Sequence, residues 1–262
     1  MARAPVRLAL LGDPVAHSRS PAIQRAALRE AGLVGDYTAV RADVDLLERT
    51  IERLRDGELT GVNITMPLKE PAFYLADELT PVARSAGSVN SLRSRQRSVE
   101  AHTTDAVAFE EILEDRTRIP DDAPVLLLGS GGTARALLAV SGTRDVFISA
   151  RSEEKATALR SEFRTAGVVP WGTGIGDAVV VNATPIGMAG EPLAEDVMRD
   201  AIALIDLPYG SQETPAIRRA EMSGLARVDG VEFLARQARA AFEWWTGEPV
   251  HLEPLIEAAR NV

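Results

Sequence analysis

The sequence predicts an α/β fold with two domains and mainly parallel sheets, and three observations lead to this prediction. Short β-rich runs alternate with amphipathic helical runs along the chain, which is the order typical of parallel βαβ units. A dense apolar run, "VLLLG" at residues 125–129, restarts that alternation and is typical of a central parallel strand. The chain has 262 residues, enough for two domains of ordinary size. A linker-like stretch, "EDRTRIPDDAP" at residues 114–124, precedes the restart.

In the first half of the chain, the best-supported helix is "VDLLERTIERLR", residues 44–55. Its apolar residues Val44, Leu47, Ile51 and Leu54 fall at helical spacing, with charged residues on the opposite face. The other elements expected here are strand Val6–Leu11, helix Pro21–Ala31, strand Tyr37–Arg41, strand Gly61–Thr65, a helical segment over 67–76, a small-residue turn over 85–91 and a strand ending near Glu100.

The second half is expected to form a further parallel sheet and a long C-terminal helix. After the strand that begins at Val125, the pattern predicts helix Thr133–Val140, strand Val146–Ala150, helix Glu153–Thr165, strand Ala178–Asn182 and strand Ile202–Asp206. The run "VEFLARQARAAFEWWTG" is amphipathic and predicts a helix. We interpret Trp244 and Trp245 near its end as packing residues rather than ligand-stacking residues.

Composition restricts the class of partner. With 45% hydrophobic and 26% charged residues, the chain has the composition of a soluble globular protein. A net charge of −9 argues against a nucleic-acid or anionic-membrane surface, so we expect small-molecule partners. The lack of cysteine excludes disulfides and thiolate metal sites, and with only three histidines we expect no bound metal. No apolar run reaches the ~18 residues of a membrane span, and "LALL" is too short for a signal-peptide core. We therefore expect a cytoplasmic protein.

A glycine pattern predicts a nucleotide site at the start of the second half. In "VLLLGSGGTARALL", Gly129, Gly131 and Ala134 match G-x-G-x-x-G/A, between an expected strand and an expected helix. Such glycines let the backbone turn tightly and approach a pyrophosphate, which the free N–H groups of the helix N-terminus stabilise. The expected dinucleotide-binding residues are Gly129, Ser130, Gly131, Gly132, Thr133 and Ala134. The alternative is a glycine turn that serves only close helix packing.

The residues after the next expected strand favour NADP over NAD. NAD sites carry an Asp or Glu about 20 residues beyond the glycines, where it binds the ribose 2′-hydroxyl. Here "SARSEEK" supplies Arg151, Ser152 and Lys155, and two cations with a hydroxyl suit a 2′-phosphate. Glu153 and Glu154 argue for NAD, because a carboxylate turned inward would repel the phosphate. Adjacent helical positions diverge by about 100°, so we expect at least one glutamate to face solvent.

Lysine is rare in this chain, because only Lys69 and Lys155 among the 29 lysine and arginine residues are lysine. Lys69 lies in "GVNITMPLKEP", beside a proline and apolar residues. Arginine stays protonated in practice, whereas a desolvated lysine can lose its proton, so only lysine can act as a proton-transfer group. The alternative is an ordinary surface lysine in an arginine-biased composition.

Further polar side chains gather in the first hundred residues. They are Ser18 and Ser20 in "GDPVAHSRSP", Asn63 and Thr65 in "NITMPLK", Asn90 in "GSVNS" and Asp105 in "AHTTDA". Ser20 and Asp105 also fit the N-cap position of a helix, which is a structural alternative to a functional role.

Together, these segments resemble the shikimate dehydrogenase family. The family's H-S-x-S-P, N-V-T-x-P-x-K and V-N-T elements are similar to "HSRSP", "NITMPLK" and "SVNS" here. Its second-domain elements are similar to "GSGGTARA", "SARSEEK" and "NATPIGM", and its glutamine-bearing C-terminal helix is similar to "EFLARQARAAFEWWTG". The matching segments follow one another in the family's order over essentially the whole chain.

The resemblance implies two α/β domains that flank a cleft. We assign a substrate-binding and catalytic domain to residues 1–103 plus 234–262, and a Rossmann-type NADP-binding domain to residues 104–233. The implied reaction is the NADPH-dependent reduction of 3-dehydroshikimate to shikimate, in the pathway to chorismate and the aromatic amino acids. Lys69 would donate the proton to the ketone oxygen as hydride arrives, and Asp105 would orient Lys69 and bind a substrate hydroxyl.

By the same resemblance, further residues would hold substrate and cofactor. Ser18 and Ser20 would hold the substrate carboxylate, with Tyr209 nearby. Thr65, Asn90 and Gln237 would bind the ring hydroxyls, and Asn63 completes the expected substrate-binding set. The nicotinamide would lie near Thr184, Met188 and Gly230. We expect the protein to be a monomer or a homodimer.

The chain departs from the family pattern at several positions. Thr103 replaces an asparagine, Gln24 and Arg25 replace a His-Asn pair, and Pro208 precedes Tyr209. The proposed catalytic groups are all present, so these departures concern substrate choice. The alternatives are a quinate or aminoshikimate dehydrogenase and, from a different class, a nucleotide-binding regulatory module without turnover.

Overall fold

A computed structural model describes residues 4–262, which divide into two compact units. Of the described residues, the first unit comprises 4–108 and 234–262, and the second comprises Phe109–Phe233. Both divisions fall inside helices, α5 (Thr104–Glu114) and α10 (Gly230–Thr246), so each of these helices contributes residues to both units. Asp105 therefore belongs to the first unit. Within residues 4–262, no helix is long and apolar enough to cross a membrane.

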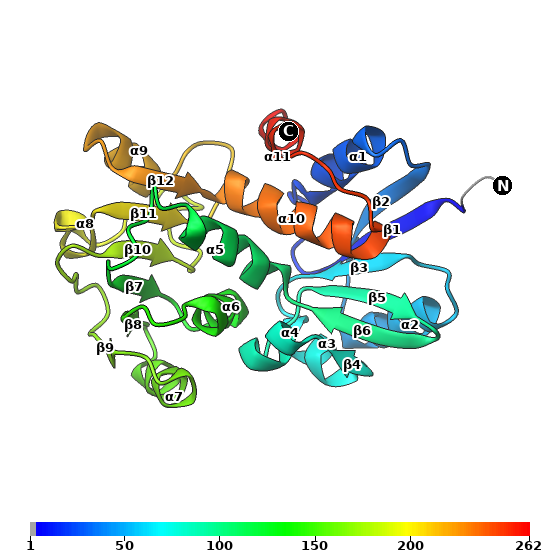
Figure 1. The fold of residues 1–262 in the computed structure, drawn as a ribbon, viewed down its shortest axis with the longest axis horizontal. Helices are drawn as coiled ribbons and strands as arrows, with labels where there is room; N and C mark the ends of the chain where they lie inside the picture. The colour runs from blue at the N-terminus through cyan, green and yellow to red at the C-terminus, as the bar shows by residue number, and fades with distance from the viewer. Residues whose placement is uncertain (1–3) are drawn as a thin grey trace. The chain divides into compact units, whose positions relative to one another are not determined.

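The first unit is built on a six-stranded mixed sheet with the order β2-β1-β3-β5-β6-β4 (Figure 1). β1 pairs in parallel with β2 and β3, whereas β5 runs antiparallel to both β3 and β6. The strands are β1 (Val6–Gly12), β2 (Gly35–Arg41), β3 (Gly61–Ile64), β4 (Glu78–Leu79), β5 (Ser91–Arg95) and β6 (Ser98–His102). Besides parts of α5 and α10, the helices are α1 (Ser20–Glu30), α2 (Val44–Arg55), α3 (Lys69–Leu75), α4 (Pro81–Ala86) and α11 (Leu252–Arg260).

The helix predicted over residues 44–55 is confirmed as α2, with the same bounds. Leu47, Ile51 and Leu54 are buried in the core of the first unit, as their helical spacing predicts, whereas Val44, at the start of the helix, is exposed. The helix begins there because Asp43 caps it, with its carboxylate accepting a hydrogen bond from the Leu46 N–H at 2.9 Å.

The segment after α3 differs from the expectation. Part of the region expected to be a turn is helix α4, which Thr80 caps at its start and which Gly87, with a φ of 58°, ends. The single strand expected to end near Glu100 is a hairpin of β5 and β6. It turns at Gln96 and Arg97, which both have positive φ. Neither residue type is a strong turn signal, so the sequence pattern gave no indication of the hairpin.

The second unit contains a six-stranded, fully parallel sheet with the order β12-β11-β10-β7-β8-β9. Numbered within the unit, this is the 3-2-1-4-5-6 order of a Rossmann-type fold. The strands are β7 (Val125–Leu128), β8 (Val146–Ser149), β9 (Gly167–Val168), β10 (Val179–Asn182), β11 (Ala203–Asp206) and β12 (Ala226–Asp229). The helices that lie wholly in this unit are α6 (Gly132–Val140), α7 (Glu153–Phe163), α8 (Glu195–Arg199) and α9 (Pro215–Met222). The prediction of an α/β fold with mainly parallel sheets is confirmed.

The stretch expected to be a linker, residues 114–124, is instead a packed part of the second unit. Ile119 is fully buried, and the Arg118 guanidinium pairs with Asp115 at 2.7 Å and with Glu232 at 2.9 Å. The polar and Pro-rich composition that suggested a linker reflects a surface segment that ion pairs hold in place.

The two tryptophans of α10 are packing residues, as expected. Trp245 is buried, and its indole N–H donates to the Leu92 carbonyl oxygen at 3.0 Å. Gly61 lies directly beneath its ring, because a Cβ at Gly61 would come within 2.5 Å of the indole. Trp244 is half-buried, and the Arg93 guanidinium carbon lies 4.2 Å from its ring centroid. These contacts attach α10 to strands β3 and β5.

Candidate functional site

Four segments of the first unit meet at one edge of its sheet. β1 and β3 are parallel, so the serine-bearing and lysine-bearing segments that follow them leave the sheet at the same edge. The Asp13 N–H donates to the Met66 carbonyl oxygen at 2.9 Å, which joins these two segments. β5 is antiparallel to β3 and begins at this edge, next to Asn90, and β6 ends there shortly before Asp105. The topology thus brings together segments that the sequence spaces far apart.

Lys69 and Asp105 form an ion pair at this edge. Lys69 is the first residue of α3, and its Nζ donates to Asp105 Oδ2 at 2.6 Å. The side chains are 20% and 7% exposed, so both groups are largely removed from water. Asp105 lies in the first turn of α5, which begins at Thr104, and the positive end of the helix dipole favours its charge there.

Asn90 and Gln237 lie beside this ion pair. Asn90 Nδ2 donates to Asp105 Oδ1 at 2.8 Å and to Gln237 Oε1 at 3.1 Å. Asn90 Oδ1 accepts from the backbone N–H of Thr104 at 2.8 Å, which fixes the orientation of the amide. The Thr104 hydroxyl also donates to Gln237 Oε1, at 3.2 Å. Lys69, Asn90, Asp105 and Gln237, all predicted from the sequence, therefore form one hydrogen-bonded cluster.

Asn63 is buried, and its amide bonds within the protein. Its Oδ1 accepts from the Tyr37 hydroxyl at 2.8 Å. Its Nδ2 donates to the Asn90 carbonyl oxygen at 3.2 Å and to Ser91 Oγ at 2.9 Å. These bonds use both amide hydrogens, so in this structure Asn63 supports Asn90 and offers no N–H to a ligand. Sequence reasoning missed Tyr37, which no motif includes, and it also missed Ser91, although Ser91 follows Asn90 in the "SVNS" element.

The two serines begin helix α1. Ser20 is its first residue and is 6% exposed, and Ser18 is half-buried, with its Oγ accepting from the Ser20 N–H at 3.3 Å. The N-cap position is Arg19 rather than Ser20, so Ser20 does not cap the helix. Thr65, also half-buried, follows β3, and its carbonyl oxygen accepts from Leu68 N–H at 2.9 Å.

Two departures from the family pattern have structural explanations. Gln24 is fully buried, and its Nε2 donates to the Ala238 carbonyl oxygen at 2.9 Å, which joins α1 to α10. Arg25 pairs with Asp36 and donates to the Tyr37 carbonyl oxygen at 2.8 Å. Thr103 is buried, and nothing in the structure explains its replacement of asparagine.

A stack of charged and aromatic groups lies at the end of β6. The His102 and Trp244 ring centroids are 5.1 Å apart, and Arg93 lies over the same indole. Burial lowers the pKa of His102 to about 4, and the Arg93 charge contributes a smaller effect in the same direction. The charge of Glu100 opposes this shift. His102 is therefore neutral at physiological pH. Its Nδ1 lies 2.9 Å from Thr80 Oγ1.

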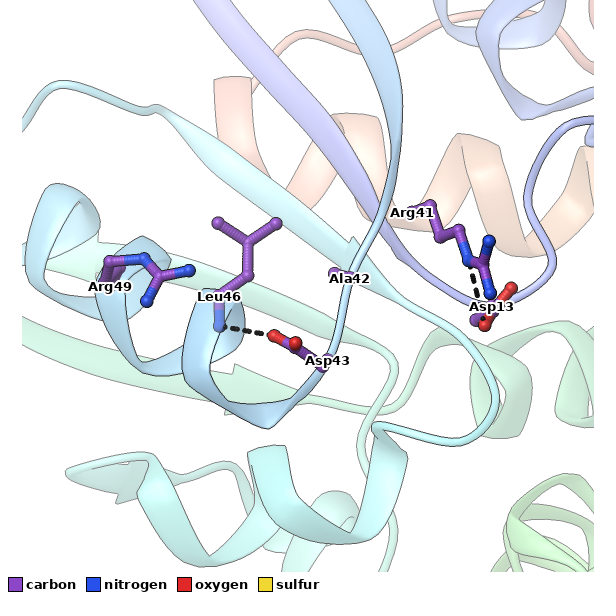
Figure 2. A pocket seen from close by; sticks show the side chains of 6 residues that line it. All are labelled: Asp13, Arg41, Ala42, Asp43, Leu46 and Arg49. Atoms are coloured by element: carbon purple, nitrogen blue, oxygen red, sulfur yellow. Dashed lines mark hydrogen bonds and ion pairs between the residues drawn. The ribbon is translucent and has the colours of Figure 1, made fainter.

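A hollow of about 400 Å³ lies at the carboxyl ends of β1 and β2 and the start of α2 (Figure 2). Its lining residues are Asp13, Arg41, Ala42, Asp43, Leu46 and Arg49. Arg41 points toward Asp13 and pairs with it at 3.1 Å, and the Asp43 carboxylate caps α2 (Figure 2). None of the residues predicted for the site lines this hollow, and its carboxylates already have partners, so we do not assign it a ligand.

In the second unit, the predicted glycine loop lies at the topological switch point of the sheet. The chain runs outward from β7 through β8 to β9, then returns to β10 on the other side of β7, and ligands bind where the strand order reverses. Gly129 has a φ of 115°, and a Cβ there would lie 2.9 Å from the Ala183 carbonyl oxygen, so the fold itself requires glycine.

Gly131 has no such structural requirement. It is the N-cap of α6, its φ of −85° suits any residue, and a Cβ there would meet nothing within 4 Å. The open space beside this glycine, at a helix N-terminus, fits the close approach of a phosphate group. The residues present therefore fit a dinucleotide better than the alternative of a turn that serves only helix packing.

The residues expected to select NADP follow β8. Arg151 and Lys155 are exposed, and Ser152 caps α7, with its Oγ accepting from the Lys155 N–H at 3.3 Å. Glu153 and Glu154 are also exposed, so neither carboxylate is buried beside the two cations. Within residues 4–262, no group of three or more His, Cys, Asp or Glu side chains is placed to hold a metal ion.

A buried carboxylate fixes the loop after β10. Asp206, at the end of β11, accepts from Asn182 Nδ2 at 2.7 Å and from the Thr214 hydroxyl. Asn182 in turn accepts from the Thr184 hydroxyl at 2.6 Å and donates to the Ile186 carbonyl oxygen at 2.9 Å. Burial raises the pKa of Asp206 to about 6, with a small contribution from Asp229, although the bonds from Thr214 and Asn182 oppose the rise. Sequence reasoning missed Asp206; its position at a strand end was the available signal.

The other predicted residues of the second unit lie on loops around this network. Met188 is 56% exposed and Tyr209 is half-buried. Gly230 begins α10, and a Cβ there would lie 2.3 Å from the Leu207 carbonyl oxygen, so this glycine is required for packing whatever else it contacts. Tyr209 belongs to the second unit, whereas Ser18 and Ser20 belong to the first.

Known proteins match this chain in both of its units. The family model described as the shikimate dehydrogenase substrate binding domain matches residues 10–92. A shikimate dehydrogenase (NADP(+)) from Methanopyrus kandleri is 35% identical over 269 residues, which cover 95% of this chain and 93% of the relative. A protein of the same name from Acidiphilium cryptum is 36% identical over 259 residues, which cover 95% of this chain and 92% of the relative.

A solved structure supports the same assignment. Shikimate 5-dehydrogenase from Thermus thermophilus, in complex with NADP(H) and shikimate, superposes with a TM-score of 0.90. It is 34% identical in sequence, and the match covers 98% of this chain and 99% of that one. With identity above 30% along almost its whole length, the chain belongs to the shikimate dehydrogenase family.

Proposed function

We propose that the chain is an NADP-dependent shikimate dehydrogenase, which reversibly reduces 3-dehydroshikimate to shikimate. The observation that carries this proposal is the Lys69–Asp105 ion pair, at 2.6 Å, in a cluster with Asn90 and Gln237. A proton donor, a carboxylate and two amides at one sheet edge suit a small molecule with several hydroxyl groups. The two relatives named above carry the same activity in their names.

The chemistry follows from the ion pair. Bound NADPH supplies the hydride to the ketone carbon of the substrate. The ketone oxygen then gains negative charge and needs a proton, which the Lys69 ammonium donates; in the reverse direction Lys69 accepts it from the hydroxyl. Asp105 holds the ammonium in place through the bond at 2.6 Å, and Asn90 holds Asp105 through the bond at 2.8 Å. A regulatory module without turnover has no use for such a pair.

The substrate would be held by groups at the same sheet edge. Ser18 and Ser20 follow β1 and would bind the carboxylate through their hydroxyls. Thr65 follows β3 and would bind a ring hydroxyl. Gln237 accepts internal hydrogen bonds at Oε1, so it would bind a substrate hydroxyl through its amide N–H groups.

The second unit would bind NADP. The loop Gly129, Ser130, Gly131, Gly132, Thr133 and Ala134 would hold the pyrophosphate, and the open space beside Gly131 supports this assignment. Arg151, Ser152 and Lys155 would bind the 2′-phosphate, and Thr184, Met188 and Gly230 would lie beside the nicotinamide. We propose residues 1–103 plus 234–262 as the substrate domain and residues 104–233 as the cofactor domain, with the first boundary at the start of α5, a few residues before the division between the two compact units inside that helix. We further propose a cytoplasmic monomer or homodimer without nucleic-acid or membrane partners, consistent with the net charge of −9.

One assay tests the proposed function. The purified protein is given shikimate or quinate, each with NADP or NAD, and the absorbance of the reduced nicotinamide is followed. We expect the highest kcat/KM for shikimate with NADP. Equal or better turnover of quinate would identify a quinate dehydrogenase instead. Tight NADP binding with no turnover of either substrate would identify a regulatory module.

A further inference from the structure

A chain of hydrogen bonds crosses the sheet of the first unit and ends at Asp105. It begins at Tyr37, which lies on the edge strand β2 and has a fully buried side chain. The Tyr37 hydroxyl donates to Asn63 Oδ1 on β3 at 2.8 Å, and Asn63 Nδ2 donates to Ser91 Oγ on β5 at 2.9 Å. Ser91 Oγ donates to Asn90 Oδ1 at 3.4 Å, and Asn90 Nδ2 donates to Asp105 Oδ1 at 2.8 Å.

The direction of each bond follows from the chemistry of its partners. Asn63 Oδ1 can only accept, so Tyr37 must donate to it, and this fixes the Asn63 amide with its hydrogens toward Asn90 and Ser91. Asp105 is likewise an acceptor when ionised, so Asn90 must present its amide hydrogens to it. Every donor therefore points from Tyr37 toward the carboxylate that holds Lys69, and bonds arranged this way strengthen one another.

The residues of this series of hydrogen bonds are buried, which makes its first donor, the Tyr37 hydroxyl, important. Tyr37 and Ser91 are fully buried, and Asn63 and Asn90 are 5% and 3% exposed. Without the Tyr37 hydroxyl, Asn63 Oδ1 would lose its donor in a place with little access to water, so nothing would hold that end of the amide in place. A shift of the Asn63 amide would weaken the bonds that its Nδ2 donates to the Asn90 carbonyl oxygen, at 3.2 Å, and to Ser91 Oγ, at 2.9 Å. Loss of these two bonds would allow Asn90 to move.

We propose that Tyr37 is a positioning residue, which acts through Asn63, Ser91 and Asn90 to hold Asp105 and Lys69 in the geometry for proton transfer. The inference rests on the proposed function. It assigns a role to a residue that none of the predicted site motifs includes. It also gives Asn63 a positioning role in place of the substrate-binding role expected from the sequence.

The test compares two substitutions that each remove one buried hydroxyl. Tyr37→Phe keeps the ring and removes the first donor. The matched control is Thr50→Val on α2, because Thr50 is also buried and its hydroxyl donates to the Leu46 carbonyl oxygen at 2.8 Å. This bond is not part of the series of hydrogen bonds from Tyr37 to Asp105. We expect Tyr37→Phe to lower kcat roughly 10-fold with a change in KM for shikimate below about 3-fold, since misplaced catalytic groups affect the chemical step. Thr50→Val should leave kcat within about 2-fold of the wild type.

A double-substitution cycle separates positioning from general loss of structure. In a Lys69→Ala background, Tyr37→Phe should reduce the residual kcat by less than about 2-fold, because its effect passes through Lys69. The same 10-fold loss in both backgrounds would overturn the proposal, as would a kcat in Tyr37→Phe equal to that of Thr50→Val. If Tyr37→Phe does not fold, Ser91→Ala removes a later member of the chain and carries the same expectations.

A measurement without turnover distinguishes failure of this inference from failure of the proposed function. In ¹H–¹⁵N spectra of the protein alone, Tyr37→Phe should shift the side-chain amide signals of Asn90, and Thr50→Val should not. Unchanged Asn90 signals would show that no coupling runs along the chain and would overturn the positioning role. Shifted signals in a protein that does not oxidise shikimate would support the coupling and overturn the proposed function.

Discussion

Lys69 Nζ and Asp105 Oδ2 lie 2.6 Å apart although the two residues are 36 positions apart in the sequence. The sheet produces this approach, because β3 ends just before the lysine segment and β6 ends at the same edge just before Asp105. Lys69 is one of only two lysines in an arginine-rich chain. Arginine in its place would supply the charge but would not release the proton.

We predict that Lys69→Ala lowers kcat by about 10²–10⁴-fold, which is the range typical of general acid–base groups. Lys69→Arg should not restore activity, because guanidinium holds its proton too firmly. Steady-state kinetics with shikimate and NADP provide the measurement. Lys155→Ala is the matched control and should change KM for NADP while leaving kcat at saturating cofactor near the wild-type value. Near-normal kcat in Lys69→Arg would refute the proton-transfer role.

Local sequence patterns predicted elements whose cause is local. Helix α2 follows from apolar spacing and the Asp43 cap, and the glycine loop follows from the conformation that Gly129 must adopt. The hairpin of β5 and β6 was missed because its turn uses Gln96 and Arg97, which carry no turn signal. The segment 114–124 was misread as a linker because the ion pair from Arg118 to Glu232 joins residues far apart in the sequence.

The candidate site likewise contains residues that a local motif predicts and residues whose role depends on contacts made only in the folded protein. Lys69, Asn90 and Asp105 were predicted because each lies in a recognisable motif, and the structure brings them together with Gln237. Tyr37 and Asp206 were not predicted, because their importance comes from tertiary burial. A buried tyrosine on a strand looks like an ordinary core residue until its hydroxyl is seen on Asn63. Pairing across strands cannot be read from the spacing of one sequence.

Gly131→Ala should weaken NADP binding at least about 10-fold while changing the free energy of unfolding by less than about 1 kcal/mol. The added methyl group meets nothing in the protein, so only a bound phosphate would encounter it. Gly129→Ala is the contrasting variant and should destabilise the fold by about 1–3 kcal/mol, because of its φ of 115°. Fluorescence titration with NADP and urea unfolding measure the two effects. Unchanged NADP affinity in Gly131→Ala would place the pyrophosphate elsewhere.

Arg151→Ala should reduce the preference for NADP over NAD by about 10–100-fold, since a hydrogen bond to a charged group contributes about 1.5–3 kcal/mol. The substitution should lower kcat/KM with NADP and not with NAD, because only NADP carries the 2′-phosphate. The ratio of kcat/KM values for the two cofactors provides the measurement. Glu153→Gln, at an exposed neighbouring position, should change the ratio far less. An unchanged ratio in Arg151→Ala would show that other residues hold the phosphate.

The difference in unfolding free energy between Asp206→Asn and the wild type should shift in favour of the variant as pH rises. The folded-state pKa of Asp206 is about 6, above its ordinary value of 3.8. Between these values the folded protein binds more protons than the unfolded chain, so the wild type loses stability as pH rises through this window. Asparagine does not ionise, so the variant should gain about 2 kcal/mol on the wild type between pH 4 and pH 7. Urea unfolding at several pH values measures this, and a pH-independent difference would contradict it.

His102→Gln should show the opposite pH dependence. The folded-state pKa of His102 is about 4, below its ordinary value of 6.5, so the unfolded chain binds more protons between these values. The wild type therefore loses stability as pH falls from 6.5 to 4, by about 2 kcal/mol after allowing for the partial exposure of the ring. The glutamine variant lacks this loss, although it is less stable at pH 7 because it gives up the stack on Trp244. Unfolding free energies at pH 7 and pH 4.5 measure both effects, with His17→Gln as a control at an exposed histidine. If the stability difference between the wild type and His102→Gln did not narrow at pH 4.5, the neutral, buried state of His102 would be refuted.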